Sequence, residues 1–154
     1  MTVGNMNSSY LFVYGTLKSD AINASAHYFH RHADLIGNAR WQGHLYLVSN
    51  YPGAVRAEAK DGFVLGELWL LKNPEYVLTF LDEYEECAPT SPLPHEYRRS
   101  VELVERNGEM IPAWLYIYAL DTSTLQRIQT GNFMNDNQEI MRRALANANI
   151  LLAS

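Results

Sequence analysis

Four carboxylates in the segment TFLDEYEEC, residues 79–87, are the side chains of this sequence best suited to acid–base chemistry: Asp82, Glu83, Glu85 and Glu86. A carboxylate that points into an apolar interior is costly to ionise unless it is paired. Such perturbed acids are common at catalytic sites, where they accept and donate protons. The chemistry therefore depends on which of the four faces inward.

The helical period singles out Glu85. We predict a helix over residues 74–86, in which each residue advances by about 100°. The apolar side chains then form one arc, made of Val77, Leu78, Phe80, Leu81 and Tyr84. Glu85 falls inside this arc, and Asp82 lies at its border. Glu83 and Glu86 lie on the opposite face, so Glu85 is the candidate general acid/base.

Two structural interpretations of Glu85 stay open on periodicity alone. The carboxylate could form an ion pair with Arg98 or Arg99, or the last turn of the helix could fray and leave it in water. Perturbed acids also occur in purely structural networks. A Glu85 paired with arginine and sealed from solvent would be structural, and a Glu85 that faces a ligand would be catalytic.

The segment VYGTLKSD, residues 13–20, is a second candidate for function. It leaves a short apolar strand and turns at Gly15. Glycine lets the backbone approach a ligand closely, and successive N–H groups in such a turn can bind an anion. An ordinary turn at the end of a strand would explain the same sequence. The segment lacks the spacing of a phosphate-binding P-loop and that of a dinucleotide-binding loop.

Histidine and cysteine give weaker signals. His27, His30 and His32 lie close together, but no acid or cysteine at ligand spacing completes a metal set. We therefore expect a solvated helix end, with no metal and no cofactor. Cys87 would need a lowered pKa and a base to act as a nucleophile, and His95 is separated from it by a proline-rich loop.

The predicted elements suggest a mixed α+β domain spanning residues 1–154. Strands are expected at 10–14, 39–48, 62–71, 96–106 and 109–120, and helices at 23–33, 74–86 and 136–152. Asn107-Gly108 between two of the strands is a strong hairpin signal, and Pro52-Gly53 is expected to form a turn. Because strands and helices do not alternate regularly, a curled, partly closed sheet is favoured over a doubly wound parallel one.

Composition excludes several classes of function. The chain has 154 residues and a net charge of −5, and no run of Lys or Arg could neutralise phosphates, so we expect no nucleic-acid partner. Its only cysteine permits no internal disulfide and favours a reducing compartment. No stretch approaches the roughly 18 apolar residues of a membrane span. The polar N-terminus does not resemble a signal peptide, so we expect a cytoplasmic protein of undetermined oligomeric state.

Short motifs in a fixed order resemble the γ-glutamylcyclotransferase-like superfamily, and within it the AIG2-like and γ-glutamylamine cyclotransferase branch. They are YGTL at 14–17, Asn23, YPG at 51–53, GELW at 66–69, LDEYE at 81–85, YRR at 97–99 and AWLYIY at 113–118. The resemblance covers residues 10 to about 133. It implies a small mixed β-barrel with flanking helices, to which the predicted helix at 136–152 is appended.

The resemblance also implies a reaction and a site. The family releases 5-oxoproline from a small γ-glutamyl substrate, by attack of the α-amine of that substrate on its own γ-carbonyl, without a metal or a redox cofactor. Glu85 corresponds to the general acid/base. The polar end of the substrate is bound by the loop of Tyr14, Gly15, Thr16 and Leu17. Tyr116 lines the pocket or is an ordinary strand aromatic.

The sequence departs from the family pattern next to these motifs. Ser19 and Asp20 stand where a basic residue and a glycine are frequent, and Glu86 stands where glycine often follows the glutamate. Because of these differences, the amine that the reaction would release from the γ-glutamyl substrate stays undetermined. Glu67 is expected to be a paired barrel residue or a support for the site. A non-catalytic binding or regulatory module on the same fold is the alternative function.

Overall fold

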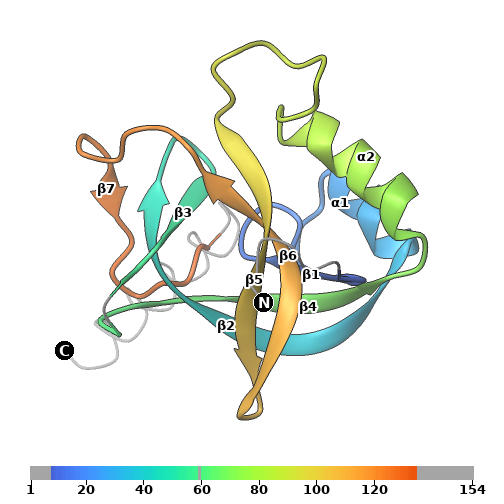
Figure 1. Ribbon diagram of the computed structural model, residues 1–154, viewed down its shortest axis with the longest axis horizontal. Helices are drawn as coiled ribbons and strands as arrows, with labels where there is room; N and C mark the ends of the chain where they lie inside the picture. The colour runs from blue at the N-terminus through green and yellow to red at the C-terminus, as the bar shows by residue number, and fades with distance from the viewer. Residues whose placement is uncertain (1–7, 59, 135–154) are drawn as a thin grey trace, which may run out of the picture.

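The computed structural model describes residues 8–58 and 60–134, and five of its strands close into a barrel (Figure 1). The barrel strands are β1 (Tyr10–Val13), β2 (Ala33–Leu47), β4 (Phe63–Leu71), β5 (Tyr97–Arg106) and β6 (Glu109–Tyr118). They pair in the order β2-β4-β1-β6-β5, and the pairing of Arg40 with Glu105 joins β5 back to β2. Strands β1 and β6 run parallel, whereas the other neighbours are antiparallel. The predicted α+β fold with a small mixed barrel is confirmed.

Two short strands and two helices complete the described residues. Strands β3 (Pro52–Arg56) and β7 (Gln126–Arg127) extend the sheet from β2. Helices α1 (Ala24–Arg31) and α2 (Pro74–Tyr84) lie together on one side of the barrel (Figure 1). The rings of Tyr28 and Phe80 meet between them, with their centroids 4.0 Å apart. Neither helix has the length and apolar character needed to cross a membrane.

Strand β1 is buried on both faces, which explains its unbroken apolar sequence. Leu11 and Val13 point toward the core shared with the helices, whereas Phe12 and Tyr14 point into the cluster formed by the barrel strands. Alternate residues of a strand face opposite sides, so one short segment serves two cores. The end of β1, and with it the loop from Gly15 onward, is thereby fixed from both sides.

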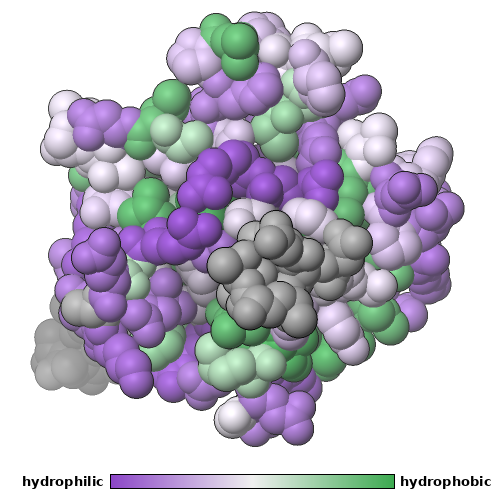
Figure 2. All heavy atoms as spheres, viewed as in Figure 1, coloured by the Kyte–Doolittle hydropathy of each residue, from purple (hydrophilic) through white to green (hydrophobic). Residues whose placement is uncertain are grey.

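Hydrophobic surface is scattered over the protein. The face viewed in Figure 1 is largely hydrophilic, with separate hydrophobic patches (Figure 2). The large apolar side chains that are exposed come from different elements, among them Ile22, Tyr76, Leu93 and Met110. Single exposed apolar residues are normal in globular proteins.

The structure places some elements differently from the sequence-based expectations. Pro52 and Gly53 begin β3 and do not form the turn. The turn lies before them, at residues 48–51, where the Val48 N–H donates to the Tyr51 carbonyl. Proline is tolerated as the first residue of a strand. Strand β2 begins at Ala33, earlier than expected, and α2 ends at Tyr84. The predicted helix at 136–152 lies outside the described residues.

The Asn107-Gly108 hairpin is confirmed. Both residues have positive φ, 51° and 81°, and they join Arg106 of β5 directly to Glu109 of β6. A two-residue turn with this backbone conformation matches the right-handed twist of the paired strands. The hairpin sets the register of β5 and β6 and therefore places Arg99 opposite Tyr116.

We predict that Gly66→Ala destabilises the barrel beside the loop that follows β1. A Cβ atom at Gly66 would lie 2.4 Å from the Val13 carbonyl oxygen and 2.7 Å from the Phe12 ring. Overpacking of this kind lowers the free energy of unfolding by about 1–3 kcal/mol. Urea denaturation measures this loss, with Leu65→Ala at the partly exposed neighbouring position as the milder control. A wild-type midpoint for Gly66→Ala would contradict the close approach of β1 and β4.

Candidate active site

A cavity of about 530 Å³ lies where the loop after β1, the end of α2 and the segments leading into β3 and β5 converge. Its lining contains all six residues that the sequence analysis selected: Tyr14, Gly15, Thr16, Leu17, Glu85 and Tyr116. Glu86, Glu96 and several tyrosines complete the wall. Segments distant in sequence therefore meet at one cavity of a size suited to a small molecule.

Glu85 is the C-cap residue of α2, and its side chain borders the cavity. The ion pair considered from the sequence is not formed, because Arg99 contacts Asp82 and Arg98 is exposed. In the described part of the chain, no hydrogen bond or salt bridge reaches the Glu85 carboxyl group. The helical period thus placed Glu85 at the cavity. Glu86, which it placed on the opposite face, also lines the cavity, because α2 ends at Tyr84 and Glu86 adopts a left-handed conformation.

The environment of Glu85 favours its protonated form. Burial is the main cause, and the negative charges of Glu96 and Asp82 add to it, so that the pKa of Glu85 rises from 4.5 to about 8. The residue is half-buried as a whole because its side chain forms part of a cavity wall. A carboxyl group with a pKa near neutrality can both accept and return a proton.

The end of α2 is closed by a Schellman motif, which fixes the backbone of Glu85. The Cys87 N–H donates to the Asp82 carbonyl at 2.9 Å, and the Glu86 N–H donates to the Glu83 carbonyl at 3.1 Å. Glu86 adopts a left-handed conformation with φ of 57°. Glycine is preferred at this position, which gives a backbone reason for the glycine that often follows the glutamate in the family pattern.

The loop after β1 is held in place by side chains from other elements. The Asn23 amide donates to the Thr16 carbonyl at 2.7 Å, and the Thr16 hydroxyl lies 2.7 Å from that of Tyr84. Glu67 accepts from the backbone N–H of Ser19 at 2.7 Å and from its hydroxyl at 2.5 Å. Glu67 therefore holds this loop through Ser19, which is compatible with both expected roles, a paired barrel residue and a support for the site.

The backbone of this loop leaves donors unused. Among the described residues, no acceptor bonds the N–H groups of Gly15, Thr16 and Leu17. Gly15 itself is required by packing, because a Cβ atom there would lie 2.8 Å from Cγ of Pro52. Close approach of a ligand is thus not the only reason for glycine at this position.

The two selected tyrosines, Tyr14 and Tyr116, use their hydroxyl groups inside the protein. The Tyr14 hydroxyl donates to the Tyr116 carbonyl at 2.6 Å and accepts from the Ala54 N–H at 3.3 Å. The Tyr116 hydroxyl donates to Asp82 Oδ1 at 2.7 Å. Burial raises the pKa of both hydroxyl groups above the ordinary value. Both residues line the cavity, but these hydroxyl groups are already bound to protein.

The partners of Asp82 and Glu96 were not predicted from the sequence. Arg99 Nε and Nη2 donate to the Asp82 carboxylate at 2.8 and 3.1 Å, and the Tyr51 hydroxyl donates to Glu96 at 2.5 Å. The only signal for the first pair was the border position of Asp82 on the apolar arc. For the second, residues 51 and 96 carry no pattern that relates them.

The weaker candidates have structural surroundings. His30 Nε2 lies 2.9 Å from the Leu17 carbonyl oxygen, and its ring stacks on Trp69. No group of three His, Cys, Asp or Glu side chains within residues 8–58 and 60–134 is arranged to hold a metal ion. Burial and the nearby carboxylates of Asp82 and Glu85 raise the pKa of Cys87 to about 12, which disfavours the nucleophilic thiolate.

Comparisons with known proteins agree with the motif order. A family model described as γ-glutamyl cyclotransferase, AIG2-like, matches residues 11–135. No curated protein matches the chain. The structure is similar to that of YkqA from Bacillus subtilis, with a TM-score of 0.63 and 22% identity over 88% of this chain and 42% of that one. This chain thus spans less than half of YkqA.

Two shorter proteins give similar structural matches. An AIG2-like protein from Mus musculus matches with a TM-score of 0.61 and 25% identity, over 79% of this chain and 86% of that one. The protein ytfP from Escherichia coli matches with a TM-score of 0.57 and 27% identity, over 83% of this chain and 98% of that one. The similarity to these two extends over most of each protein.

We predict that Glu85→Gln stabilises the protein at alkaline pH. Because the pKa of Glu85 is raised to about 8 from 4.5, the folded state holds its proton more tightly than the unfolded state. Its contribution to stability is complete below the unfolded pKa and is lost as the pH rises through the folded pKa. The variant avoids this loss. Its free energy of unfolding in urea, relative to that of the wild type, should therefore grow by up to a few kcal/mol between pH 5 and pH 9. Glu83→Gln, on the exposed face, is the control. An advantage that does not change with pH would contradict the perturbed titration of Glu85.

Proposed function

Because this chain belongs to the γ-glutamyl cyclotransferase, AIG2-like family, we propose that it releases 5-oxoproline from a γ-glutamyl amide, with Glu85 as the general acid/base. The observation that carries the proposal is the Glu85 carboxyl group, which borders a cavity, contacts no cation in the described residues and has a pKa of about 8. A structural acid in the same position would be expected to have a charged partner.

The proposed reaction is intramolecular. The α-amine nitrogen of the substrate attacks its own γ-carbonyl carbon, and the bond to the leaving nitrogen breaks. The α-ammonium nitrogen loses two protons on its way to the lactam N–H, one before the attack and one from the tetrahedral adduct. The leaving nitrogen gains two as it departs as an ammonium ion. Glu85 accepts and returns these protons in turn, so no proton is gained or lost overall. Because nucleophile and electrophile belong to one molecule, the main task of the cavity is to hold the substrate in its folded conformation.

The pKa of Glu85 suits this proton transfer. An α-amino group has an ordinary pKa of about 8, and that of Glu85 is also about 8. Transfer between groups of similar proton affinity has little cost in either direction, and general acid–base catalysis is most effective near such a match. An ordinary glutamate would be a much weaker base toward an α-ammonium group.

The loop of residues 15–17 is proposed to supply the positive potential of the site. Among the described residues, the charged side chains that line the cavity are Glu85, Glu86 and Glu96. Backbone N–H groups at Gly15, Thr16 and Leu17 could therefore bind the α-carboxylate of the substrate or stabilise the developing oxyanion. Lys18 is not needed for this, because its Nζ donates to the Phe133 carbonyl at 2.8 Å.

We predict that Glu85→Gln abolishes turnover while the fold is retained, because the amide keeps the shape and loses the base. The expected loss in kcat is on the order of 10²–10⁴, measured as 5-oxoproline release across a panel of γ-glutamyl dipeptides and γ-glutamylamines. Glu83→Gln should remain near wild type. An inactive Glu83→Gln with an active Glu85→Gln would refute the assignment. A wild-type protein that binds these compounds without turnover would favour the non-catalytic alternative.

We also predict that Lys18→Ala retains most of the activity. Its ammonium group bonds the segment at Phe133, so the kcat/KM of the folded variant should stay within a few-fold of wild type. Gly15→Val should lose substrate binding, because its Cβ would collide with Pro52 and displace the loop. Steady-state kinetics at matched folded fractions distinguish the two. A tenfold rise in KM for Lys18→Ala would show that the lysine binds substrate.

A further inference from the structure

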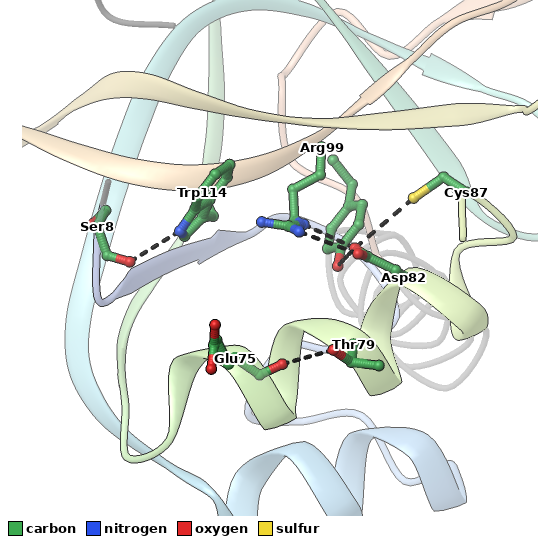
Figure 3. A network of polar contacts seen from close by, with 8 residues as sticks. Ser8, Glu75, Thr79, Asp82, Cys87, Arg99 and Trp114 are labelled. Atoms are coloured by element: carbon green, nitrogen blue, oxygen red, sulfur yellow. Dashed lines mark hydrogen bonds and ion pairs between the residues drawn. The ribbon is translucent and has the colours of Figure 1, made fainter. Parts of the chain in front are cut away.

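Asp82 lies one helical turn before Glu85 and is the acceptor at the centre of a polar network outside the proposed chemistry (Figure 3). We propose that Asp82, clamped by Arg99 and Tyr116, is a positioning residue that holds the Glu85 carboxyl group in the cavity. The inference rests on the proposed function of Glu85. It adds a residue that the helical period had placed only at the border of the apolar arc.

The clamp joins α2 to two neighbouring strands. Arg99 of β5 and Tyr116 of β6 are direct cross-strand partners, so their side chains lie on the same face of the sheet. Arg99 donates two hydrogen bonds to the Asp82 carboxylate, and Tyr116 donates a third. The side chains of Asp82 and Arg99 are 18% and 25% exposed. At this burial, a bidentate pair is stronger and more specific than a surface salt bridge.

Arg99 is also held by contacts other than its ion pair with Asp82. Its guanidinium group lies 4.3 Å from the centre of the Trp114 ring, and the Trp114 indole donates to the Ser8 carbonyl at 2.9 Å. Figure 3 shows Arg99 between Trp114 and Asp82, with Cys87 beyond the carboxylate. The Arg99 guanidinium group that pairs with Asp82 is thus held by the barrel and not by α2.

Asp82 also anchors the turn that carries Glu85. Its carbonyl accepts the Cys87 N–H, which closes the Schellman motif around Glu85 and Glu86. The side chain of the same residue is fixed to the barrel. Displacement of Asp82 would therefore move the backbone of Glu85, and errors of about 1 Å at a reacting group can cost two orders of magnitude in rate.

The clamp has an electrostatic consequence that a purely structural contact lacks. The negative charge of Asp82 contributes to the raised pKa of Glu85, and Arg99 offsets that charge. Loss of the Asp82 charge should therefore lower the pKa of Glu85, and loss of Arg99 should raise it. The other titratable groups around Glu85 remain in both variants: Tyr84 at the end of α2, Glu86 and Cys87 just after it, Glu96 just before β5, Tyr97 at its start, Tyr14 after β1 and Tyr116 on β6.

The test compares Asp82→Asn with Arg99→Gln. The pH dependence of kcat/KM and a ¹³C NMR titration of the Glu85 carboxyl carbon, assigned by its absence in Glu85→Gln, are measured for each. We expect the acid limb and the NMR midpoint to move to lower pH in Asp82→Asn and to higher pH in Arg99→Gln. We also expect kcat to fall about tenfold or more in both, with a smaller change in KM. Midpoints that stay in place, or that move in the same direction, would overturn the inference.

A matched control and a fallback keep the test decisive. Arg40 forms the same kind of ion pair with Glu105 on the exposed side of the barrel, so Arg40→Gln should leave both midpoints unchanged. If Asp82→Asn or Arg99→Gln fails to fold, Tyr116→Phe removes one donor from Asp82 and keeps the aromatic ring. A Glu85 midpoint moved to higher pH in that variant supports the clamp, and an unmoved one overturns it. Should the wild type release no 5-oxoproline, the proposed function fails, whereas the NMR titrations still decide whether Asp82 controls Glu85.

Discussion

The desolvation of the Glu85 carboxyl group is the interaction on which the rest of the site depends. Each unit by which the pKa rises above its ordinary value corresponds to about 1.4 kcal/mol of preference for the protonated form. A fold can keep such a group only if neighbouring contacts hold it in place, since the group itself contributes no ion pair within the described residues. Helix α2 provides this through Val77, Leu78 and Leu81, which are buried against the barrel. The acid thus occupies the end of an element that is anchored by its apolar face.

Most side chains near the cavity build it instead of facing a ligand with their polar atoms. The Tyr14 hydroxyl joins β1 to β3 and β6, Asn23 and Glu67 hold the loop after β1, and Gly15 leaves room for Pro52. Within residues 8–58 and 60–134, the cavity groups without a hydrogen bond include the carboxyl group of Glu85 and a short row of backbone N–H groups. A site of this kind is preorganised, because its supporting hydrogen bonds are complete before a ligand arrives.

One of the positions that differ from the family pattern, Glu86, lines the same cavity as Glu96. Glu86 occupies a left-handed position after α2, and Glu96 follows the proline-rich loop at 88–95 and accepts a hydrogen bond from Tyr51. Both carboxylates line the cavity that residues 15–17 also line. Loops on a rigid scaffold are where related proteins acquire different specificities. Under the proposed function, these two carboxylates are therefore candidates for contact with the leaving amine.

The sequence by itself determined the features that depend on neighbours along the chain. The helical period turned Glu85 toward the apolar face, the unbroken apolar run of β1 marked it as buried, and Asn107-Gly108 specified the hairpin. Only the tertiary structure decided which distant groups pair. Arg99 pairs with Asp82 and not with Glu85. The reason is that barrel closure and the β5–β6 register place its guanidinium group over the Trp114 ring, facing the side of α2 that carries Asp82. Pro52 and Gly53 likewise became strand residues because β2 was available to pair with them. Such choices depend on distances between segments far apart in sequence, which no local period encodes.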